Sequence, residues 1–195
     1  MPEPMPPILT TERLTLRPLL DGDGAALFAI FSDPDVVRYW SRSAWTDMAQ
    51  ADEMLAAAMR DYADGSGLRY GIVVTATNEL VGVASLFAFS RDNRRCETGY
   101  VLGSRHWGRG YASEALVAVL EHAFGALGMN RVEADIDPQN IASGRVLEKL
   151  AFRREGLMPE RWIVHGEKAD TAFYGLLKSY WDARTPSRSS VAAAG

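Results

Sequence analysis

Two glycines, Gly108 and Gly110, stand one residue apart where an extended segment must give way to a helix. A short apolar segment, residues 100–102, leads into them, and a strongly apolar helical pattern, residues 116–127, follows. Glycine tolerates a positive φ and lets other atoms approach the backbone closely. The first turn of a helix leaves N–H groups unpaired, and these favour an anion. The stretch therefore indicates either a phosphate-binding loop or simply a tight strand-to-helix connection.

The spacing Arg105-x-x-Gly108-x-Gly110 differs from the dinucleotide fingerprint G-x-G-x-x-G and from the P-loop. It resembles the acetyl-CoA-binding motif of the GNAT superfamily of N-acetyltransferases, Gln/Arg-x-x-Gly-x-Gly/Ala. The wider run 97–115 is similar to the branch that acetylates the N-termini of ribosomal proteins, and the resemblance extends from Thr11 to Trp181. It implies acetyl-CoA as the cosubstrate and N-acetyl transfer as the reaction.

The resemblance assigns acetyl-CoA binding to the segment around the two glycines and to a second segment further on. The residues so assigned are Tyr100, Val101, Leu102, Arg105, Trp107, Gly108, Arg109, Gly110, Tyr111, Ala112, Asn140 and Ser143. Main-chain N–H groups of residues 105–112 would hold the pyrophosphate, and Arg105 and Arg109 would add charge-assisted contacts. Preorganised N–H groups near Val101 and Leu102 would polarise the thioester carbonyl.

The second segment, residues 137–152, resembles the GNAT pattern Asn-x-x-Ser/Ala followed by Glu-Lys-x-Gly-Phe. By resemblance, Asn140 hydrogen-bonds the pantetheine arm and Ser143 lies near the thioester sulfur. Their spacing puts both on one helix face, where Asn140 is also a competent N-cap, so a purely structural role stays open. Two positions depart from the pattern. Leu147 stands where many relatives have a tyrosine general acid, and Ala151 replaces the usual glycine.

Acetyl transfer to an amine requires a group that takes a proton and a group that supplies one. An α-amine titrates near ~8 and is mostly protonated at neutral pH, so a carboxylate must take its proton, directly or through water. Glu97 is the candidate base, because it shares a strand face with Val101; an exposed or ion-paired strand carboxylate is the alternative. Ser143 is the candidate proton donor to the thiolate, although a serine hydroxyl is a weak acid and positioning a water is its alternative role.

Aromatic residues mark the candidate acceptor site. Tyr39 and Trp40 lie between two predicted helices, where they either plug the core or, as the resemblance implies, wall the acceptor cleft; Phe87 is the third candidate contact. The branch resemblance favours a protein N-terminus as acceptor, while an amino acid, a polyamine or an aminoglycoside remains a competitor because fold does not determine substrate. Because Leu147 replaces the tyrosine acid of many relatives, a second class of function also stays open: a module that binds acyl-CoA without catalysing transfer.

Composition limits the partners. The net charge of −4 argues against a nucleic-acid partner and mildly favours a cationic acceptor.

The one cysteine, Cys96, excludes an internal disulfide framework and a cysteine metal cluster, and we expect it to be half exposed. The three histidines lack metal-ligand spacing, so no metal is expected. No apolar run approaches ~20 residues, and the Pro-rich N-terminus lacks the basic-then-apolar build of a signal peptide, so we expect no membrane partner and a cytoplasmic location. A homodimer remains open.

The periodicity predicts one α/β domain of the mixed α+β kind over residues 8–184, with a flexible arm at 1–7 and a disordered tail at 185–195. We expect a central mixed, mostly antiparallel sheet of about seven strands, flanked by about four helices. Residues 97–102 and 131–136 should form a parallel pair, because a crossover helix separates them. The resemblance implies that this pair splays apart and forms the CoA cleft.

Overall fold

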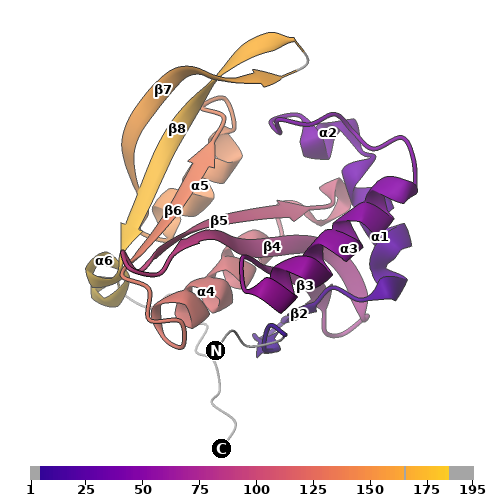
Figure 1. Cartoon of the computed structure of the whole chain (residues 1–195), viewed down its shortest axis with the longest axis horizontal. Helices are drawn as coiled ribbons and strands as arrows, with labels where there is room; N and C mark the ends of the chain where they lie inside the picture. The colour runs from indigo at the N-terminus through magenta and orange to yellow at the C-terminus, as the bar shows by residue number, and fades with distance from the viewer. Residues whose placement is uncertain (1–4, 165, 185–195) are drawn as a thin grey trace, which may run out of the picture.

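The computed structural model describes residues 5–164 and 166–184. These residues form one mixed sheet with helices on both faces (Figure 1). In chain order the elements are β1 (Leu9–Thr10), β2 (Leu14–Pro18), a 3-10 turn (Asp21–Asp23), α1 (Gly24–Phe31), α2 (Pro34–Val37), α3 (Ala49–Asp64), β3 (Leu68–Val74), β4 (Glu79–Ser90), β5 (Arg95–Leu102), a 3-10 turn (Ser104–His106), α4 (Tyr111–Phe124), β6 (Arg131–Ile136), α5 (Ile141–Lys149), β7 (Arg153–Val164), β8 (Glu167–Leu177) and α6 (Lys178–Ala183).

The strands lie in the order β1-β2-β3-β4-β5-β6-β8-β7. All neighbours are antiparallel except β5 and β6, which run parallel. The predicted mixed, mostly antiparallel sheet is therefore confirmed. The described residues contain eight strands and six α-helices, and the elements beyond the expected numbers are the short β1, α2 and α6. A strand of two residues is too short to show alternation, and helices of four and six residues are too short to show a helical period.

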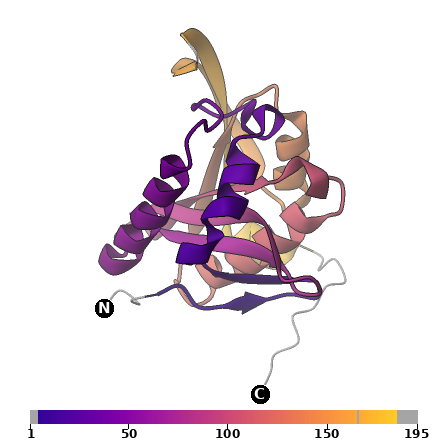
Figure 2. The ribbon, with the colours of Figure 1, turned by 90° about the vertical axis from the view of Figure 1, so that its right-hand side faces the viewer.

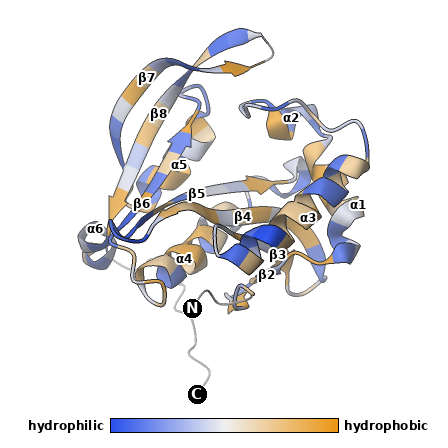
Figure 3. Ribbon diagram, viewed as in Figure 1, coloured by the Kyte–Doolittle hydropathy of each residue, from blue (hydrophilic) through white to orange (hydrophobic). Residues whose placement is uncertain are grey.

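Helices α1 and α3 cover one face of the sheet, and α4 and α5 cover the other (Figure 2). Each face carries its own apolar core, because successive side chains of a strand point to opposite sides. In β3, for example, Ile72 packs on the α4 side and Val73 on the α1 and α3 side. Figure 3 shows the apolar residues gathered on β3, β4 and α4 in the middle of the molecule.

The parallel strands β5 and β6 separate after a short stretch of pairing. They pair at three positions, from Arg95 with Arg131 to Glu97 with Glu133. Beyond these, β5 continues to Leu102 without pairing to β6, which stays paired with β8 on its other edge. Figure 1 shows the two strands diverging. The expected splay is present, and it opens beside the helix that connects the two strands.

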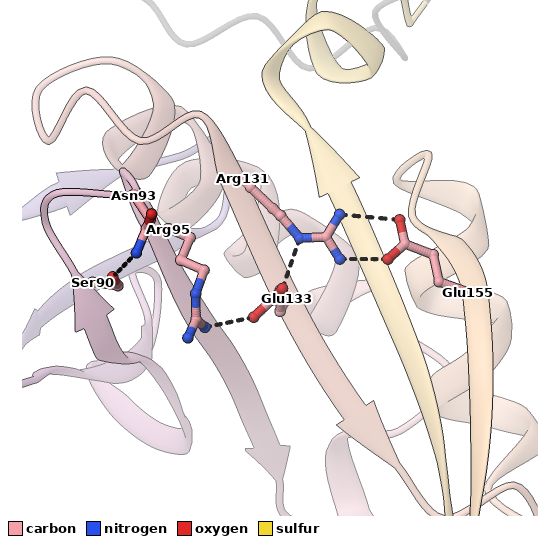
Figure 4. Close-up of polar contacts among 6 residues, drawn as sticks. All are labelled: Ser90, Asn93, Arg95, Arg131, Glu133 and Glu155. Atoms are coloured by element: carbon pink, nitrogen blue, oxygen red, sulfur yellow. Dashed lines mark hydrogen bonds and ion pairs between the residues drawn. The ribbon is translucent and has the colours of Figure 1, made fainter.

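An ion-pair network holds the end at which β5 and β6 remain together (Figure 4). The Arg131 guanidinium donates to Glu133 Oε1 at 2.7 Å and also pairs with Glu155 of β7, while Arg95 Nη1 donates to Glu133 Oε2 at 2.8 Å. The hydrogen bond to Glu155 raises the pKa of Arg131 above its ordinary value. Gly175 of β8 lies directly against this ion pair. A Cβ at that position would come within 2.5 Å of both Arg131 and Glu155. The network therefore joins β5, β6 and β7 across β8.

The sequence expectation for Cys96 needs revision. Cys96 is fully buried, not half exposed, because its side chain points into the core on the α4 side. Residues 153–164 form one long strand, β7, with a register shift between Met158 and Trp162, so the region is a single hairpin with β8. Residue 165, residues 1–4 of the arm and the tail 185–195 lie outside the described residues. No helix in the described part is both long and apolar enough to cross a bilayer.

Candidate active site

The loop before α4 has the backbone that its two glycines suggested. Gly108 has φ +73° and Gly110, the N-cap of α4, has φ +81°, both in the left-handed region that L side chains rarely adopt. No side chain of the described residues caps the helix, and the first helical bond runs from Glu114 N–H to the Gly110 carbonyl. The N–H groups of residues 111–113 therefore have no partner within the helix. They are free to bind an anion.

Two cations accompany these donors. Arg105 and Arg109 are exposed, and neither side chain makes a hydrogen bond or ion pair with another residue of the described ranges. A Cβ on Gly108 would meet nothing within 4 Å, so the loop is open on that side. Unpaired main-chain donors at a helix N-terminus, with nearby guanidinium groups, suit a bound diphosphate. The chemistry of the loop thus fits the phosphate end of a CoA ester.

A half-buried carboxylate connects the N-terminal segment to this loop. Glu114 accepts from Thr11 Oγ1 at 2.6 Å and from the Arg13 N–H at 2.9 Å, and it pairs with the Arg13 guanidinium at 2.6 Å. Arg13 Nη1 also donates to the Arg109 carbonyl at 3.0 Å, inside the glycine loop. Burial alone would raise the pKa of Glu114, but the Thr11 and Arg13 hydrogen bonds outweigh it and lower that pKa. The sequence did not point to Arg13.

The end of β5 presents main-chain groups to the gap between β5 and β6. Gly103 N–H donates to the Val81 carbonyl at 2.9 Å, and donor directions alternate along an antiparallel ladder. The N–H of Leu102 therefore faces away from β4, toward the gap, and the Leu102 carbonyl accepts from Trp107 Nε1 at 2.9 Å. Val101, in contrast, faces β4 with its N–H and buries its side chain in the core beside α1 and α3.

Three polar groups meet across the gap. Asn140 caps α5 by accepting from the Ser143 N–H at 3.1 Å, so its structural role is confirmed, and its amide N–H₂ group stays available for a ligand. Ser143 is buried, and Tyr100 Oη donates to Ser143 Oγ at 3.1 Å. Burial raises the pKa of Tyr100, and the hydrogen bond to Ser143 opposes this rise only in part. Leu147, one turn further along α5, is buried and offers no hydroxyl.

A cavity of about 520 Å³ connects the aromatic segment after α1 with this gap. It runs from the loop before α3, across β4 and β5, to β6 and the start of α5. The predicted acceptor and cofactor residues that line it are Tyr39, Trp40, Phe87, Tyr100, Val101, Asn140 and Ser143. The glycine loop, residues 105–112, does not line it, and neither does Leu102. The structure therefore divides the predicted site into two parts: the glycine loop, where we expected phosphate binding, and the cavity, where we expected the reaction.

The aromatic residues pack against the core and also line the cavity. The ring of Trp40 packs edge-on against Phe31, with centroids 5.4 Å apart, and Trp45 stacks on Phe31 at 4.6 Å. Both tryptophans also line the cavity, as does Tyr39. The exposed fractions of Tyr39 and Phe87 are 36% and 39%. Rings anchored in the core on one side can wall a cavity on the other.

Two carboxylates share the face of β5 and β6 that bears on the cavity. Burial, followed by the negative charges of Asp135 and Glu133, raises the pKa of Glu97. Glu133 is neutralised by two arginines, whereas neither Glu97 nor Asp135 forms a hydrogen bond or ion pair with a described residue. Asp135 lines the cavity; Glu97 does not. The sequence did not single out Asp135, although the alternation over 131–136 puts it on the same face as Glu133.

The sequence matches a family model described as an acetyltransferase (GNAT) domain over residues 13–153. "Uncharacterized N-acetyltransferase YoaA" of Bacillus subtilis (strain 168) is 37% identical over 172 residues, or 88% of this chain and 97% of that protein. The ribosomal protein uS5-alanine N-acetyltransferase of Escherichia coli (strain K12) is 27% identical over 92% of this chain and 94% of its own. The spermidine N(1)-acetyltransferase of Vibrio cholerae is 22% identical, with coverages of 86% and 94%.

Solved structures share the fold. The acetyltransferase (GNAT family) from Bacillus anthracis superposes with a TM-score of 0.80 at 27% identity, over 89% of this chain and 99% of that one. RimJ of Mycobacterium smegmatis, in complex with CoA-disulfide, superposes with a TM-score of 0.83 at 24% identity, over 92% and 91% of the two chains. The second likeness bears on the fold alone.

Proposed function

The chain belongs to the GNAT acetyltransferase family, and from this premise we propose that it moves the acetyl group of acetyl-CoA to a primary amine, with a protein N-terminal α-amine as the first candidate acceptor. Proteins of this family are N-acetyltransferases that use acetyl-CoA. The observation that carries the proposal is the cavity. It leads from aromatic side chains to Asn140 and Ser143, through the gap where β5 and β6 separate.

The acyl donor would enter from the α4 side of this gap. Its diphosphate would lie on residues 105–112, with unpaired N–H groups and the charges of Arg105 and Arg109 around it. The Leu102 N–H and the Asn140 amide would align the pantetheine arm, and the thioester would end beside Ser143. Trp107 would hold the end of β5 in place through its hydrogen bond to the Leu102 carbonyl.

The acceptor amine would enter from the opposite side, past Tyr39, Trp40 and Phe87. Asp135 would attract its ammonium form, since this carboxylate lines the cavity and forms no ion pair with any residue that the structure describes. The raised pKa of Glu97 brings this carboxyl closer to the pH at which it can take a proton and release it again. We assign the base to this carboxylate pair, with Glu97 acting through water because it does not line the cavity.

The relatives support two acceptor classes. The Escherichia coli relative is named for an alanine of a ribosomal protein, which favours a protein N-terminus. The Vibrio cholerae relative is named for spermidine, and the Asp135 and Asp137 carboxylates beside Trp40 favour a small cationic amine as the second candidate. A non-catalytic acyl-CoA-binding module would bind CoA and release none in the presence of either class.

The test is CoA release from acetyl-CoA with short peptides of free N-terminus and with polyamines. Asp135→Asn and Glu97→Gln should each lower kcat/KM for the preferred amine by about 10²-fold or more, because the proton-accepting carboxylates are lost. Gly110→Trp should abolish CoA binding in a folded protein, since the left-handed loop cannot close around the phosphates.

Glu53→Gln is the matched control, because Glu53 is an exposed carboxylate on α3 and does not line the cavity. It should leave turnover unchanged. Full activity of both Asp135→Asn and Glu97→Gln would remove the carboxylate pair from the mechanism. CoA binding by the unaltered chain without turnover of any amine would favour the non-catalytic module.

From the sequence alone we also propose a cytoplasmic location. The same grounds allow a homodimer, and sedimentation of the purified chain distinguishes a dimer from a monomer.

A further inference from the structure

The leaving thiolate lacks an obvious proton donor in this chain. Leu147, buried in α5, carries no hydroxyl, and a serine alone is a much weaker acid than a thiol. A second hydroxyl nevertheless reaches the same place from another element. Tyr100 extends from β5 across the gap and donates to Ser143 Oγ of α5 at 3.1 Å. Both residues line the reaction cavity.

We propose that Tyr100 is the proton source for the departing thiolate and that it delivers the proton through Ser143. The proposal rests on the proposed acetyl transfer. Because Tyr100 Oη is the donor in the hydrogen bond, Ser143 Oγ keeps its own proton for a third group in the cavity. The main-chain N–H of Ser143 is held by Asn140 Oδ1, so the first turn of α5 that carries the hydroxyl is fixed in place.

The step conserves protons. As the C–S bond breaks, its electron pair goes to sulfur; Ser143 gives its proton to the sulfur and receives the proton of Tyr100. The products are a free thiol and a phenolate, and the phenolate regains a proton from solvent. The neutral amine loses one proton to the carboxylates and then to solvent, so the two exchanges balance. A thiol ordinarily titrates near ~8.5 and tyrosine near ~10, and burial raises the pKa of Tyr100 further. The transfer is therefore uphill, and reprotonation of the phenolate from solvent completes it.

Tyr100 is suited to store this proton. Burial is the largest cause of its raised pKa, so the phenol stays neutral at physiological pH, and no charged side chain contributes to the shift. The charged residues that line the same cavity are Arg42, Asp61, Arg69, Asp135 and Asp137. Leu147 closes the cavity on the α5 side and leaves Ser143 as the hydrogen-bond partner of the Tyr100 hydroxyl in the described structure.

The experiment is a double-mutant cycle of Tyr100→Phe and Ser143→Ala, with the amine that the unaltered chain acetylates. Each single variant should lower kcat by about 10²-fold with the KM for acetyl-CoA within twofold, and the double variant should lose no more than the worse single one. The limb of the kcat–pH profile that reports the acid should disappear in Tyr100→Phe. Independent, multiplying losses, or a kcat and pH profile unchanged in Tyr100→Phe, would overturn the relay.

A rescue variant separates this role from packing. In the Tyr100→Phe background, Leu147→Tyr returns a phenol from α5 and should recover at least tenfold in kcat, whereas Leu147→Phe, of matched size, should not. Equal behaviour of the two would contradict proton supply. If the unaltered chain binds CoA and acetylates no amine, the proposed function fails and the relay with it; an active chain with an unaffected Tyr100→Phe variant refutes the relay alone.

Discussion

At the scale of single residues, Ala151 occupies a backbone conformation that suits glycine. Its φ is +71°, in the turn that ends α5. Phe152 N–H donates to the Leu147 carbonyl and Ala151 N–H to the Glu148 carbonyl, both at 3.0 Å, which is the Schellman pattern of helix termination. Alanine in place of the family's usual glycine therefore keeps the helix-terminating turn, and the backbone of Ala151 is strained in it. The hydrogen bonds of the helix end, and not the residue type, impose the geometry.

Replacing this alanine should stabilise the protein. Ala151→Gly removes the contact between Cβ and backbone that disfavours positive φ, and we expect the free energy of unfolding to rise by about 1 kcal/mol. That corresponds to a rise in Tm of about 2–4 °C for a chain of this size. Thermal and urea unfolding measure both.

Ala56→Gly provides the control of opposite sign, because Ala56 is exposed within α3 and glycine there should cost about 1 kcal/mol. A loss of stability in Ala151→Gly as well would contradict the assignment of strain to this turn.

At the scale of elements, the start of α4 is tied to the segment before β2. Glu114 lies in the first turn of α4 and receives hydrogen bonds from Thr11 and Arg13, and Arg13 continues to the Arg109 carbonyl. The glycine loop is therefore supported from outside by a residue about a hundred positions earlier in the chain. A loop of left-handed glycines has few conformational restraints of its own, so this support limits how far it can move.

Glu114→Gln should weaken both the fold and the grip on acetyl-CoA. We expect a loss of about 1–3 kcal/mol at neutral pH, as for hydrogen bonds to a charged group, and a several-fold higher Kd for acetyl-CoA. The pKa of Glu114 is lowered below its ordinary 4.5, so the stabilisation is complete above that value and disappears as the pH falls through the lowered pKa. Denaturant unfolding between pH 3 and pH 7 tests this.

Glu121→Gln is the matched control on the same helix, since the nearest cation, Arg184, lies at 3.8 Å and the Glu121 side chain is 42% exposed. Its effect should stay below about 0.5 kcal/mol. A stability difference between Glu114→Gln and the unaltered chain that is as large at pH 3 as at pH 7 would show that the charge of Glu114 is not the cause.

At the scale of the whole molecule, Cys96 reports on the opening of the core. It is the only cysteine in the chain and is fully buried, opposite Val132, where β5 and β6 pair. Burial, with smaller contributions from the charges of Glu133 and Glu97, raises the pKa of its thiol to about 12. A thiol that is both covered and protonated reacts only after the sheet opens between these strands.

Labelling of Cys96 by a thiol reagent should therefore follow unfolding. We expect slow modification in native buffer, fast modification in denaturant, and a labelling rate reduced about 100-fold by acetyl-CoA at 100 times its Kd, because the ligand binds only the folded chain. Fast, ligand-independent labelling of the native protein would place the thiol at the surface.

The sequence by itself determined the features that depend on neighbouring residues. The two glycines indicated the loop and its positive φ angles, because that backbone excludes side chains. The alternation of apolar and polar residues indicated the strands, and the helix between residues 102 and 131 required β5 and β6 to run parallel. The cap at Asn140 was also readable, because its partner is three residues away.

Only the tertiary structure decided which distant side chains meet. It leaves Asp135 without an ion-pair partner among the described residues, while Glu133, on the same strand face, is neutralised by Arg95 and Arg131. It brings Tyr100 to Ser143 across 43 residues of chain and Arg13 to Glu114 across 101. The physical reason is that such contacts depend on where two strands part and on which charge each side chain reaches, and spacing along the chain records neither.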